Sequence, residues 1–231
     1  MNSVLLTIDD IASRNTPSIV DALCDRQISA ILFATGANVE RHWAEAVYAL
    51  RKGMIVGNHS YSHPGFSSLT LEEGIADIEK CEAVLERLYR EAGVERIYRP
   101  FRFPYGDKGG ENKAALQQYL AQRHFDKVDD RHIPYAWWHE NGLDQDIDTF
   151  WTFDFEEYRL AWNDGFTYAS IQAKMQNPAP VQGAALYGEN QRNILLLHDH
   201  AETDAVLPGY YRLFIEDMLK NGIVFDEPRF L

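Results

Sequence analysis

Short apolar runs alternate along this chain with segments in which apolar residues recur at helical spacing. Residues 4–8, 28–34 and 194–197 are dominated by apolar side chains, as in strands that are buried on both faces. Residues 75–88 instead place Ile, Cys and Leu on one side of a helix. Strands that alternate with amphipathic helices are typical of a parallel sheet, so the pattern predicts an α/β fold.

The expected elements cover most of the chain. The expected strands are 4–8, 28–34, 54–56, 127–128, 149–155, 194–197 and 223–225. The expected helices are 16–24, 38–53, 70–88, 111–122, 171–176 and 210–219. Asn38 is expected to cap the second helix, and Thr70 with Glu73 forms a capping box at the start of the third. The length and the strand count predict a single domain, 1–231, folded as a distorted (β/α) barrel of about seven parallel strands.

The charge of the chain excludes partners that need a basic surface. Its 22 Lys and Arg residues against 35 Asp and Glu give a net charge of −13 over 231 residues. Nucleic acid and anionic membrane surfaces are therefore not expected partners. No apolar run approaches about 20 residues, and no basic segment followed by an apolar one opens the chain, so neither a transmembrane helix nor a signal peptide is expected. The sequence as given predicts a cytoplasmic protein, or a secreted or periplasmic one if a leader was removed.

Side chains that can carry chemistry gather where the expected strands end. In chain order they are Asp9, Asp10, His59, His63, residues 102–106, Asp154 and His198. In barrels of parallel strands the active site lies at the carboxyl ends of the strands. Two histidines and one carboxylate are a complete ligand set for a catalytic metal, and a further carboxylate and histidine supply a base and an acid. Each residue alone is also compatible with a solvated strand-end charge, but five successive strand ends favour an active site.

Five short stretches at these strand ends occur in a fixed order. They are residues 6–10 (Leu-Thr-Ile-Asp-Asp), 30–36, 57–64 (Gly-Asn-His-Ser-Tyr-Ser-His-Pro), 102–106 (Arg-Phe-Pro-Tyr-Gly) and 196–199 (Leu-Leu-His-Asp). Together they resemble the motifs of the polysaccharide deacetylases, which form carbohydrate esterase family 4 and share the NodB homology domain. The resemblance spans most of the chain and is strongest from residue 4 to residue 106.

The resemblance implies a metal site. Asp10, His59 and His63 would bind one divalent ion. Zinc is the default metal, although cobalt, nickel or manganese also suits two histidines and a carboxylate.

The resemblance also implies a role for the other candidate residues. Asp9 would be the general base, and Arg102 would hold it ionised through an ion pair. The amide N–H of Tyr105 would stabilise the oxyanion. His198 would protonate the leaving amine, and Leu196 would line the pocket for the acetyl methyl group.

Some positions depart from the family pattern. Ile11 stands where the family usually has glycine, and Tyr158 stands where its fourth motif has tryptophan. Trp137 and Trp138 lie within the loop-rich residues 124–150, in an insertion around residues 137–139 that has no family counterpart. They either bind sugar or pack in the core. No function is assigned to His139 or His200.

Asp154 is the expected partner of His198, because it ends the preceding strand and matches the first Asp of the family's fourth motif. A carboxylate within hydrogen-bond reach raises the pKa of an imidazole and fixes its tautomer. The alternative is that His198 is a buried structural histidine.

The resulting hypothesis is a metal-dependent hydrolase that removes N-acetyl or O-acetyl groups from a carbohydrate. The leading substrate contains N-acetylglucosamine, as chitin and peptidoglycan do, and the net charge disfavours anionic polymers. Acetylxylan and a small non-sugar amide or imide stay open as substrates. The rival from another class is a non-catalytic carbohydrate- or metal-binding module on the same fold. The sequence predicts no particular oligomeric state.

Overall fold

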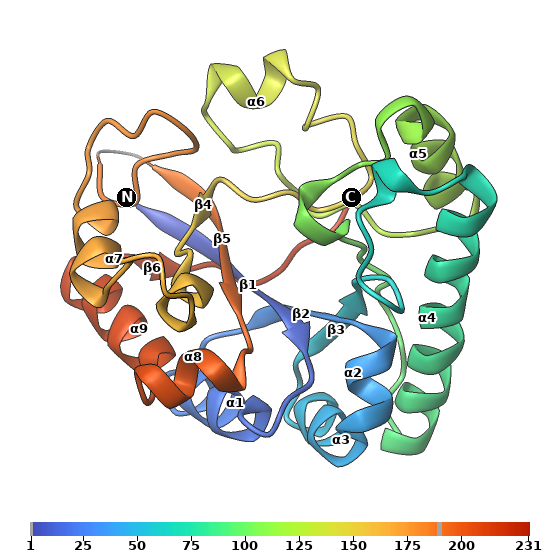
Figure 1. Cartoon of the computed structure of the whole chain (residues 1–231), viewed down its shortest axis with the longest axis horizontal. Coiled ribbons are helices and arrows are strands. Elements are labelled where there is room, and N and C mark those ends of the chain that lie inside the picture. Colours follow the sequence, from blue (N-terminus) through green and yellow to red (C-terminus); the bar gives the residue numbers. More distant parts are fainter. Residues whose placement is uncertain (1, 189–190) are drawn as a thin grey trace.

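The computed structural model of the chain describes residues 2–188 and 191–231 (Figure 1). Within them, six strands form one sheet in the order β3–β2–β1–β5–β4, and β6 pairs with the start of β1. The strands are β1 (Ser3–Ile11), β2 (Ala30–Ala34), β3 (Ile55–Asn58), β4 (Phe153–Asp154), β5 (Arg192–His198) and β6 (Val224–Phe225). All these pairings are parallel, which confirms the predicted α/β architecture.

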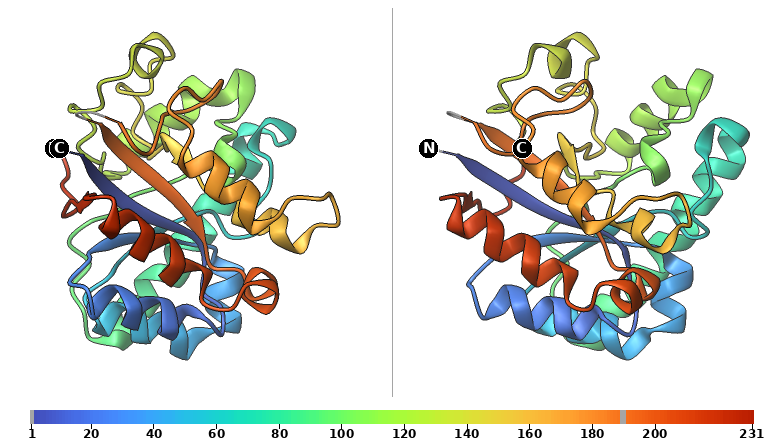
Figure 2. Two further views of the ribbon diagram at one scale, coloured as in Figure 1. Left: turned by 90° about the vertical axis from the view of Figure 1, so that its left-hand side faces the viewer. Right: turned by 60° about the vertical axis from the view of Figure 1, so that its left-hand side comes forward.

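Helices cover one face of the sheet. The α-helices are α1 (Thr16–Cys24), α2 (Gly36–Arg41), α3 (Trp43–Arg51), α4 (Leu71–Ala92), α5 (Lys113–Gln122), α6 (Ala136–Glu140), α7 (Tyr168–Met175), α8 (Ala201–Val206) and α9 (Tyr210–Lys220). The 3₁₀ helices are η1 (Phe66–Ser68), η2 (Pro104–Gly106), η3 (Gly110–Asn112) and η4 (Glu157–Ala161). Figure 2 shows α1, α3 and α9 on one side of the sheet and the segment 124–150 on the other. In the described part of the chain, no helix is long and apolar enough to cross a membrane.

Side chains of β1 alternate between two environments. Leu6 and Ile8 pack in the larger core beneath the helices, whereas Leu5 packs in a second core inside the curved sheet. Because side chains on a strand point alternately to its two faces, Asp9 lies on the inner side with Leu5. The register also pairs Asp9 with His198 of the neighbouring strand β5. One end of the sheet interior therefore receives charged groups from both central strands.

The barrel closes through irregular segments on the side away from β1. Asn58 at the end of β3 forms a single parallel bridge with Phe101. The N–H of Thr149 then donates to the carbonyl of Phe101 at 2.8 Å, and the N–H of Thr152 donates to β5 at 2.8 Å. The predicted distorted barrel is confirmed, although most of the expected strand 149–155 is irregular and only its end forms β4.

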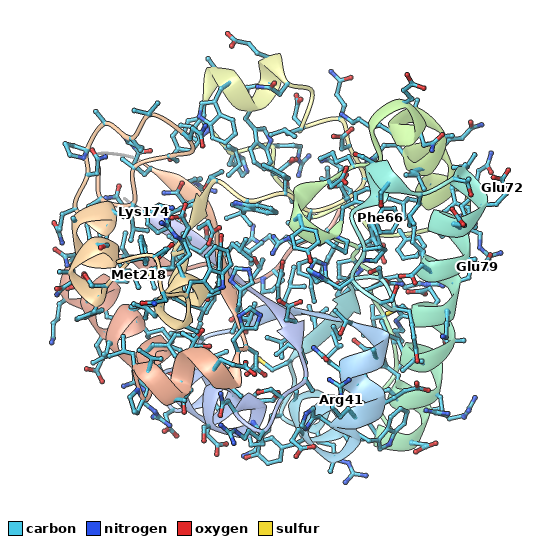
Figure 3. The ribbon with its side chains drawn as sticks, viewed as in Figure 1. Arg41, Phe66, Glu72, Glu79, Lys174 and Met218 are labelled. Carbon is cyan, nitrogen blue, oxygen red and sulfur yellow. The ribbon has the colours of Figure 1, made fainter. Side chains whose placement is uncertain are left out.

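The long helix α4 begins and ends as local sequence dictates. Thr70 and Glu73 form the predicted capping box, in which each side chain accepts from the other residue's N–H. Gly93 ends the helix with a φ of 71°, a conformation that glycine adopts without a steric penalty. Figure 3 shows Glu72 and Glu79 pointing outward from α4, opposite the apolar side that packs on the sheet.

The predicted helix 38–53 is two helices, and its predicted cap is wrong. The backbone breaks at His42, whose φ and ψ are −125° and 51°, so α2 and α3 have separate axes. Thr35 is the N-cap of α2, and its hydroxyl accepts from the N–H of Asn38 at 3.3 Å. The side chain of Asn38 instead donates to the carbonyl of Asp10 at 2.9 Å. Asn38, which was predicted to cap a helix, therefore stabilises the end of β1 instead.

The segment 124–150 fills the barrel from the side opposite the helices. Trp138 in α6 is buried there, and its Nε1 donates to Asp130 at 3.2 Å. Trp137 stacks on Tyr135 with 5.8 Å between ring centroids. Of the two interpretations of the tryptophan pair, core packing is the one observed. The expected strand 127–128 is reduced to one antiparallel bridge between Val128 and Phe230.

Candidate active site

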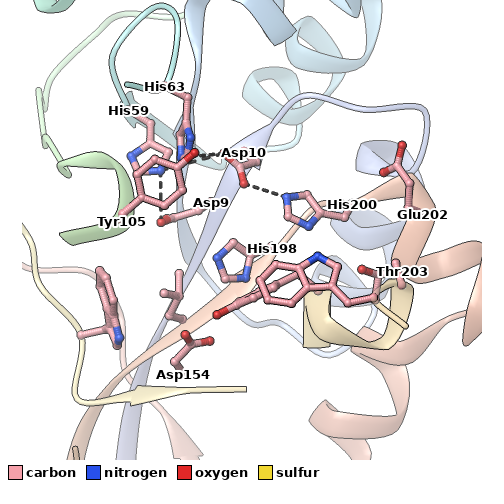
Figure 4. A pocket seen from close by; sticks show the side chains of 15 residues that line it. Asp9, Asp10, His59, His63, Tyr105, Asp154, His198, His200, Glu202 and Thr203 are labelled. Carbon is pink, nitrogen blue, oxygen red and sulfur yellow. Dashed lines mark hydrogen bonds and ion pairs between the residues drawn. The ribbon is translucent and has the colours of Figure 1, made fainter. Parts of the chain in front are cut away.

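A cavity of about 670 Å³ opens at the carboxyl ends of β1, β3, β4 and β5 (Figure 4). It brings together eight of the nine site residues expected from the sequence: Asp9, Asp10, His59, His63, Tyr105, Asp154, Leu196 and His198. The ninth, Arg102, is fully buried beside Asp9 and supports the cavity wall. Elements far apart in the sequence thus meet at the edge where the strand-end argument expected them.

Asp10, His59 and His63 form a group that fits a metal ion. Each offers one ligand atom, and these atoms all lie within 4.8 Å of one another. Nε2 of His63 is 3.4 Å from Oδ1 of Asp10, and Nε2 of His59 is 3.9 Å from the same oxygen. Two imidazoles and a carboxylate match the donor set of catalytic divalent ions, with further positions left for substrate or water.

The surroundings of His59 and His63 favour metal binding through their ring nitrogens. Nδ1 of His59 lies 2.8 Å from the carbonyl of Arg102, and because a carbonyl only accepts, Nδ1 carries the proton. Nε2 of His59 is therefore the ring nitrogen left to bind a metal. Burial lowers the pKa of His63, which favours the neutral imidazole that metals bind.

The loop that carries both histidines is held by polar contacts. The N–H of Ser60 donates to Oδ1 of Asn58 at 2.7 Å, and the N–H of His63 donates to the hydroxyl of Ser60 at 3.1 Å. Asp77 of α4 accepts from the N–H groups of Tyr61 and Ser62. Ser60 and His63 both have positive φ, so these bonds offset an unfavourable backbone conformation.

Asp9 and Arg102 form a buried ion pair, as the resemblance implied. Nη1 of Arg102 is 2.8 Å from Oδ1 of Asp9 and 2.7 Å from the hydroxyl of Thr7. Nε of the same guanidinium donates to the carbonyl of Thr149 at 2.9 Å. The other oxygen of Asp9 lies 3.4 Å from Nε2 of His59, which puts it at the edge of the candidate metal group.

His198 is held by Glu157, and the predicted hydrogen bond to Asp154 is wrong. Oε1 of Glu157 lies 3.1 Å from Nδ1 of His198 and accepts from its N–H at 2.6 Å. Glu157 is fully buried because η4 turns back beneath the end of β5 directly after the two-residue strand β4. One indication of this role is present in the sequence: residues 154–158 align with the family's fourth motif, Asp-x-x-Asp-Trp, and Glu157 stands at its second Asp.

Asp154 lies near this pair without bonding to the imidazole. Its Oδ1 accepts from the N–H of Glu156 at 2.8 Å, and ligand atoms of Asp154, Glu157 and His198 lie within 4.8 Å of one another. Burial raises the pKa of Asp154 to about 6. Burial lowers the pKa of His198, but the charge and hydrogen bond of Glu157 outweigh it, with help from Asp154, and raise that pKa to about 10. His198 is therefore an imidazolium at neutral pH.

His200 belongs to the site, although no function was assigned to it from the sequence. Its Nε2 lies 2.7 Å from Oδ2 of Asp10, the oxygen that faces away from His63. Burial raises the pKa of Asp10, but the hydrogen bond of His200 and the nearby histidine charges outweigh it and hold that pKa below its usual range. The signal was the spacing of His198 and His200, because residues two apart at a strand end point to the same side.

The rim and walls of the cavity are largely aromatic. Tyr105 is 72% exposed and packs edge-on against His63 with 4.5 Å between ring centroids. Leu196 is buried at the base. Figure 4 shows Tyr105 beside His59 and His63, and Glu202 and Thr203 beyond His200. His139 lies outside the cavity lining and contacts Asp144 at 2.9 Å, so the structure assigns it no part in this site.

The charge of the cavity is acidic apart from its histidines. The carboxylates of Asp9, Asp10, Asp154 and Glu202 line it, and among its described lining residues none is lysine or arginine. Apart from the His198 imidazolium, the described lining therefore offers no cationic side chain to pair with a carboxylate or a phosphate of a substrate.

Proteins of known sequence match somewhat less than half of this chain. The chain is 35% identical over 106 residues to a peptidoglycan-N-acetylglucosamine deacetylase of Bacillus cereus, covering 45% of this chain and 36% of that protein. It is 31% identical over 105 residues to a chitooligosaccharide deacetylase of Sinorhizobium fredii, covering 45% of this chain and 47% of that protein. The chain thus matches less than half the length of either relative.

Solved structures share its fold along nearly the whole length. A polysaccharide deacetylase from Bacillus cereus superimposes with a TM-score of 0.66 at 20% identity, covering 98% of this chain and 92% of that one. A CE4 family pseudoenzyme from Bacillus anthracis superimposes with a TM-score of 0.59 at 20% identity, covering 97% and 63%. At these identities the likeness concerns the fold alone. The family model described as polysaccharide deacetylase matches residues 1–123, more than half of the 231 residues, and the chain belongs to that family.

Proposed function

We propose that this chain is a metal-dependent hydrolase that removes N-acetyl groups from oligo- or polysaccharides containing N-acetylglucosamine, and that residues 1–231 act as one catalytic domain. One observation carries the proposal. The Asp10, His59 and His63 group and the His198–Glu157 pair line the same cavity, with the Asp9–Arg102 ion pair beside them. Acyl transfer to water needs these three parts together: an electrophilic centre, a base and an acid.

The metal is proposed as one divalent ion held by Asp10, His59 and His63. Zinc is the default, and cobalt, nickel or manganese suits the same donors. A divalent ion at this position would supply Lewis-acid chemistry, polarising the acetyl carbonyl and acidifying a water molecule. The lowered pKa values of His63 and Asp10 support this assignment, because metal ligands must bind in their deprotonated forms.

Asp9 is proposed as the general base. Its Oδ1 is held by Arg102 at 2.8 Å, which leaves Oδ2 to accept a proton from the attacking water. Thr7 and Thr149 hold the guanidinium in place, so the base is oriented before substrate arrives.

His198 is proposed as the general acid. It enters the reaction as an imidazolium, because Glu157 raises its pKa to about 10. The leaving amine must gain a proton as the C–N bond breaks, and His198 would provide it from the end of β5, beside Asp9 at the end of β1. Glu157 also fixes Nδ1, so Nε2 is the nitrogen that faces the cavity.

The remaining assignments concern the acetyl group. Leu196 is a buried apolar residue at the base of the cavity, suited to the acetyl methyl. Tyr105 follows the turn at Pro104 with a φ of 57°, and its backbone N–H is proposed as a donor to the developing oxyanion.

An uncharged amino sugar derivative is the substrate that the charge of the cavity supports best. The two relatives described above are named for deacetylation of peptidoglycan N-acetylglucosamine and of chitooligosaccharide. No lysine or arginine of the described lining is available to pair with an anionic unit, such as an N-acetylmuramic acid whose lactyl carboxyl group is free.

The rival proposal is a non-catalytic binding module, because a family pseudoenzyme has the same fold. The base and acid of this chain, each with a buried charged partner, count against it. Acetate release by the metal-loaded protein should be compared across chitooligosaccharides, acetylxylan and peptidoglycan, with His198→Ala as the inactive control. Release from chitooligosaccharides in excess of the other two is the expected result, and no release above the control from any of the three would favour the binding module.

A further inference from the structure

Trp162 is an exposed tryptophan on the wall of the active-site cavity. It follows η4 directly, and 56% of its surface is accessible to solvent. A single exposed apolar residue needs no explanation by itself. Trp162, however, lines the cavity that holds His198 and the candidate metal group, and it is part of a connected aromatic surface.

That surface runs from the general acid to the rim. Tyr158 packs edge-on against His198 with 4.9 Å between ring centroids, and Trp162 packs on Tyr158 at 5.1 Å. Tyr158 is the position at which the family motif has tryptophan. The ring of Tyr158 thus forms the wall next to His198, and the indole of Trp162 packs on the Tyr158 ring.

The segment that presents Trp162 is braced on both sides. The N–H of Trp162 donates to the carbonyl of Arg159 at 3.0 Å, and the guanidinium of Arg159 bonds Glu156 and Asp164, each at 3.0 Å. The same guanidinium lies 4.2 Å from the centroid of Phe166. An aromatic ring held in place before binding loses little conformational entropy when a ligand stacks on it.

The groups near Trp162 limit the class of ligand that can bind there. Glu202 and Thr203 of α8 line the same part of the cavity, next to His200 (Figure 4). Thr203 is fully buried, so the group that can reach a ligand here is the exposed carboxylate of Glu202. A carboxylate accepts hydrogen bonds from the hydroxyl groups of a sugar, whereas it repels an anion. A flat indole face suits the C–H face of a pyranose ring.

We propose that Trp162 is the stacking platform of a second sugar subsite, which binds the pyranose ring next to the one that loses its acetyl group. The inference rests on the proposed function, because the first ring must occupy the cavity beside His198. It makes the enzyme selective for oligosaccharides: a monosaccharide fills only the inner part of the site, and each longer substrate gains the contact with Trp162.

The test is the dependence of activity on chain length. The ratio of kcat/KM for tetra-N-acetylchitotetraose to that for N-acetylglucosamine is measured in the wild type and in Trp162→Ala, Trp162→Leu and Trp162→Phe. We expect the ratio to fall about tenfold in the Ala and Leu variants and less than threefold in the Phe variant, which keeps an aromatic face. Tyr98→Ala is the matched control, because Tyr98 is also exposed but stacks on Phe230 outside the cavity lining, and its ratio should not change.

A binding measurement separates this inference from the proposed function. Addition of tetra-N-acetylchitotetraose to metal-free protein should change its tryptophan fluorescence. Trp162→Phe should reduce that change while keeping the wild-type melting temperature, and the remainder is expected from Trp151, which lines the same cavity. If the wild type releases no acetate from any sugar but the fluorescence change is smaller in Trp162→Phe, the proposed function fails and the subsite stands. An unchanged ratio in Trp162→Ala, or a fluorescence change as large in Trp162→Phe as in the wild type, would overturn the subsite.

Discussion

Nδ1 of His198 lies 3.1 Å from Oε1 of Glu157, a carboxylate that is buried completely beneath it. The contact joins the end of β5 to η4 and leaves only Nε2 of the imidazole facing the cavity. The same carboxylate raises the pKa of His198 to about 10, so this pair sets both the orientation of the ring and the charge of the proposed general acid.

Replacing Glu157 with glutamine should therefore lower the pH at which activity is lost. A general acid works while it is protonated, so turnover falls as the pH rises through the pKa of His198. Removing the carboxylate charge lowers that pKa, and we expect the alkaline limb of the profile of kcat against pH to move down by about 1–3 pH units. Asp154→Asn is the matched control, because Asp154 does not bond to the ring. An equal or larger displacement in Asp154→Asn would contradict the assignment of Glu157.

Replacing Asp10 should remove both the bound metal and the activity, whereas replacing Asp9 should remove only the activity. Asp10→Asn takes away a proposed ligand and should abolish both bound metal and activity. Asp9→Asn should retain the metal while turnover falls by about 10²–10⁴-fold, because only the base is lost. Metal content after dialysis, measured by atomic emission, tests the division. It is a demanding test, since the free oxygen of Asp9 lies only 3.4 Å from Nε2 of His59, and equal metal loss in both variants would show that Asp9 is a ligand too.

His200 should tune metal affinity through Asp10. Its bond to Oδ2 orients the carboxylate so that Oδ1 faces His63, and loss of such an outer contact usually lowers metal affinity about 10–100-fold. The dissociation constant of zinc for His200→Ala, measured by competition with a chelating dye, tests this. His139→Ala removes another histidine–carboxylate contact outside the cavity and serves as the control. Equal zinc affinity in the two variants would contradict the role given to His200.

Gly57 should be required for closure of the barrel. A Cβ at this position would lie 2.7 Å from the carbonyl oxygen of Pro100, a backbone atom that cannot move aside cheaply. We expect Gly57→Ala to lower the free energy of unfolding by about 1–3 kcal/mol. Gly65→Ala is the comparison, because the nearest atom to its Cβ would be a side-chain oxygen of Asp107 at 3.3 Å. Urea denaturation of both variants measures the free energies of unfolding. Similar values for the two variants would mean that the contact between β3 and Pro100 tolerates a side chain at position 57.

Local patterns in the sequence were sufficient for most of the sheet and for the convergence of the candidate residues, whereas the choice of Asp10 over Asp9 as the ligand came from the resemblance. Asp10 follows a clear apolar strand, and His59 and His63 share one short loop, so their convergence needed only the rule that parallel strands end at one edge. The capping box at Thr70 was equally local.

The partners of these residues depended on tertiary structure, which no local pattern encodes. Glu157 reaches His198 because a 3₁₀ turn follows a strand of only two residues, and the sequence pattern had suggested a longer strand. His200 contacts Asp10 from the far end of the chain. The break at His42 could not be predicted, because the apolar residues before and after it keep the spacing of one continuous helix.

The central claim is that this cavity removes acetyl groups from N-acetylglucosamine chains with the help of a divalent ion. It is tested most directly by measuring acetate and free amine together, after zinc is added to chelator-treated protein in the presence of tetra-N-acetylchitotetraose. The account predicts no release before zinc is added, equimolar acetate and amine afterwards, and a rate at least about 10²-fold lower in His198→Ala. No acetate after zinc is restored, or a rate that is the same in the wild type and in His198→Ala, would contradict it.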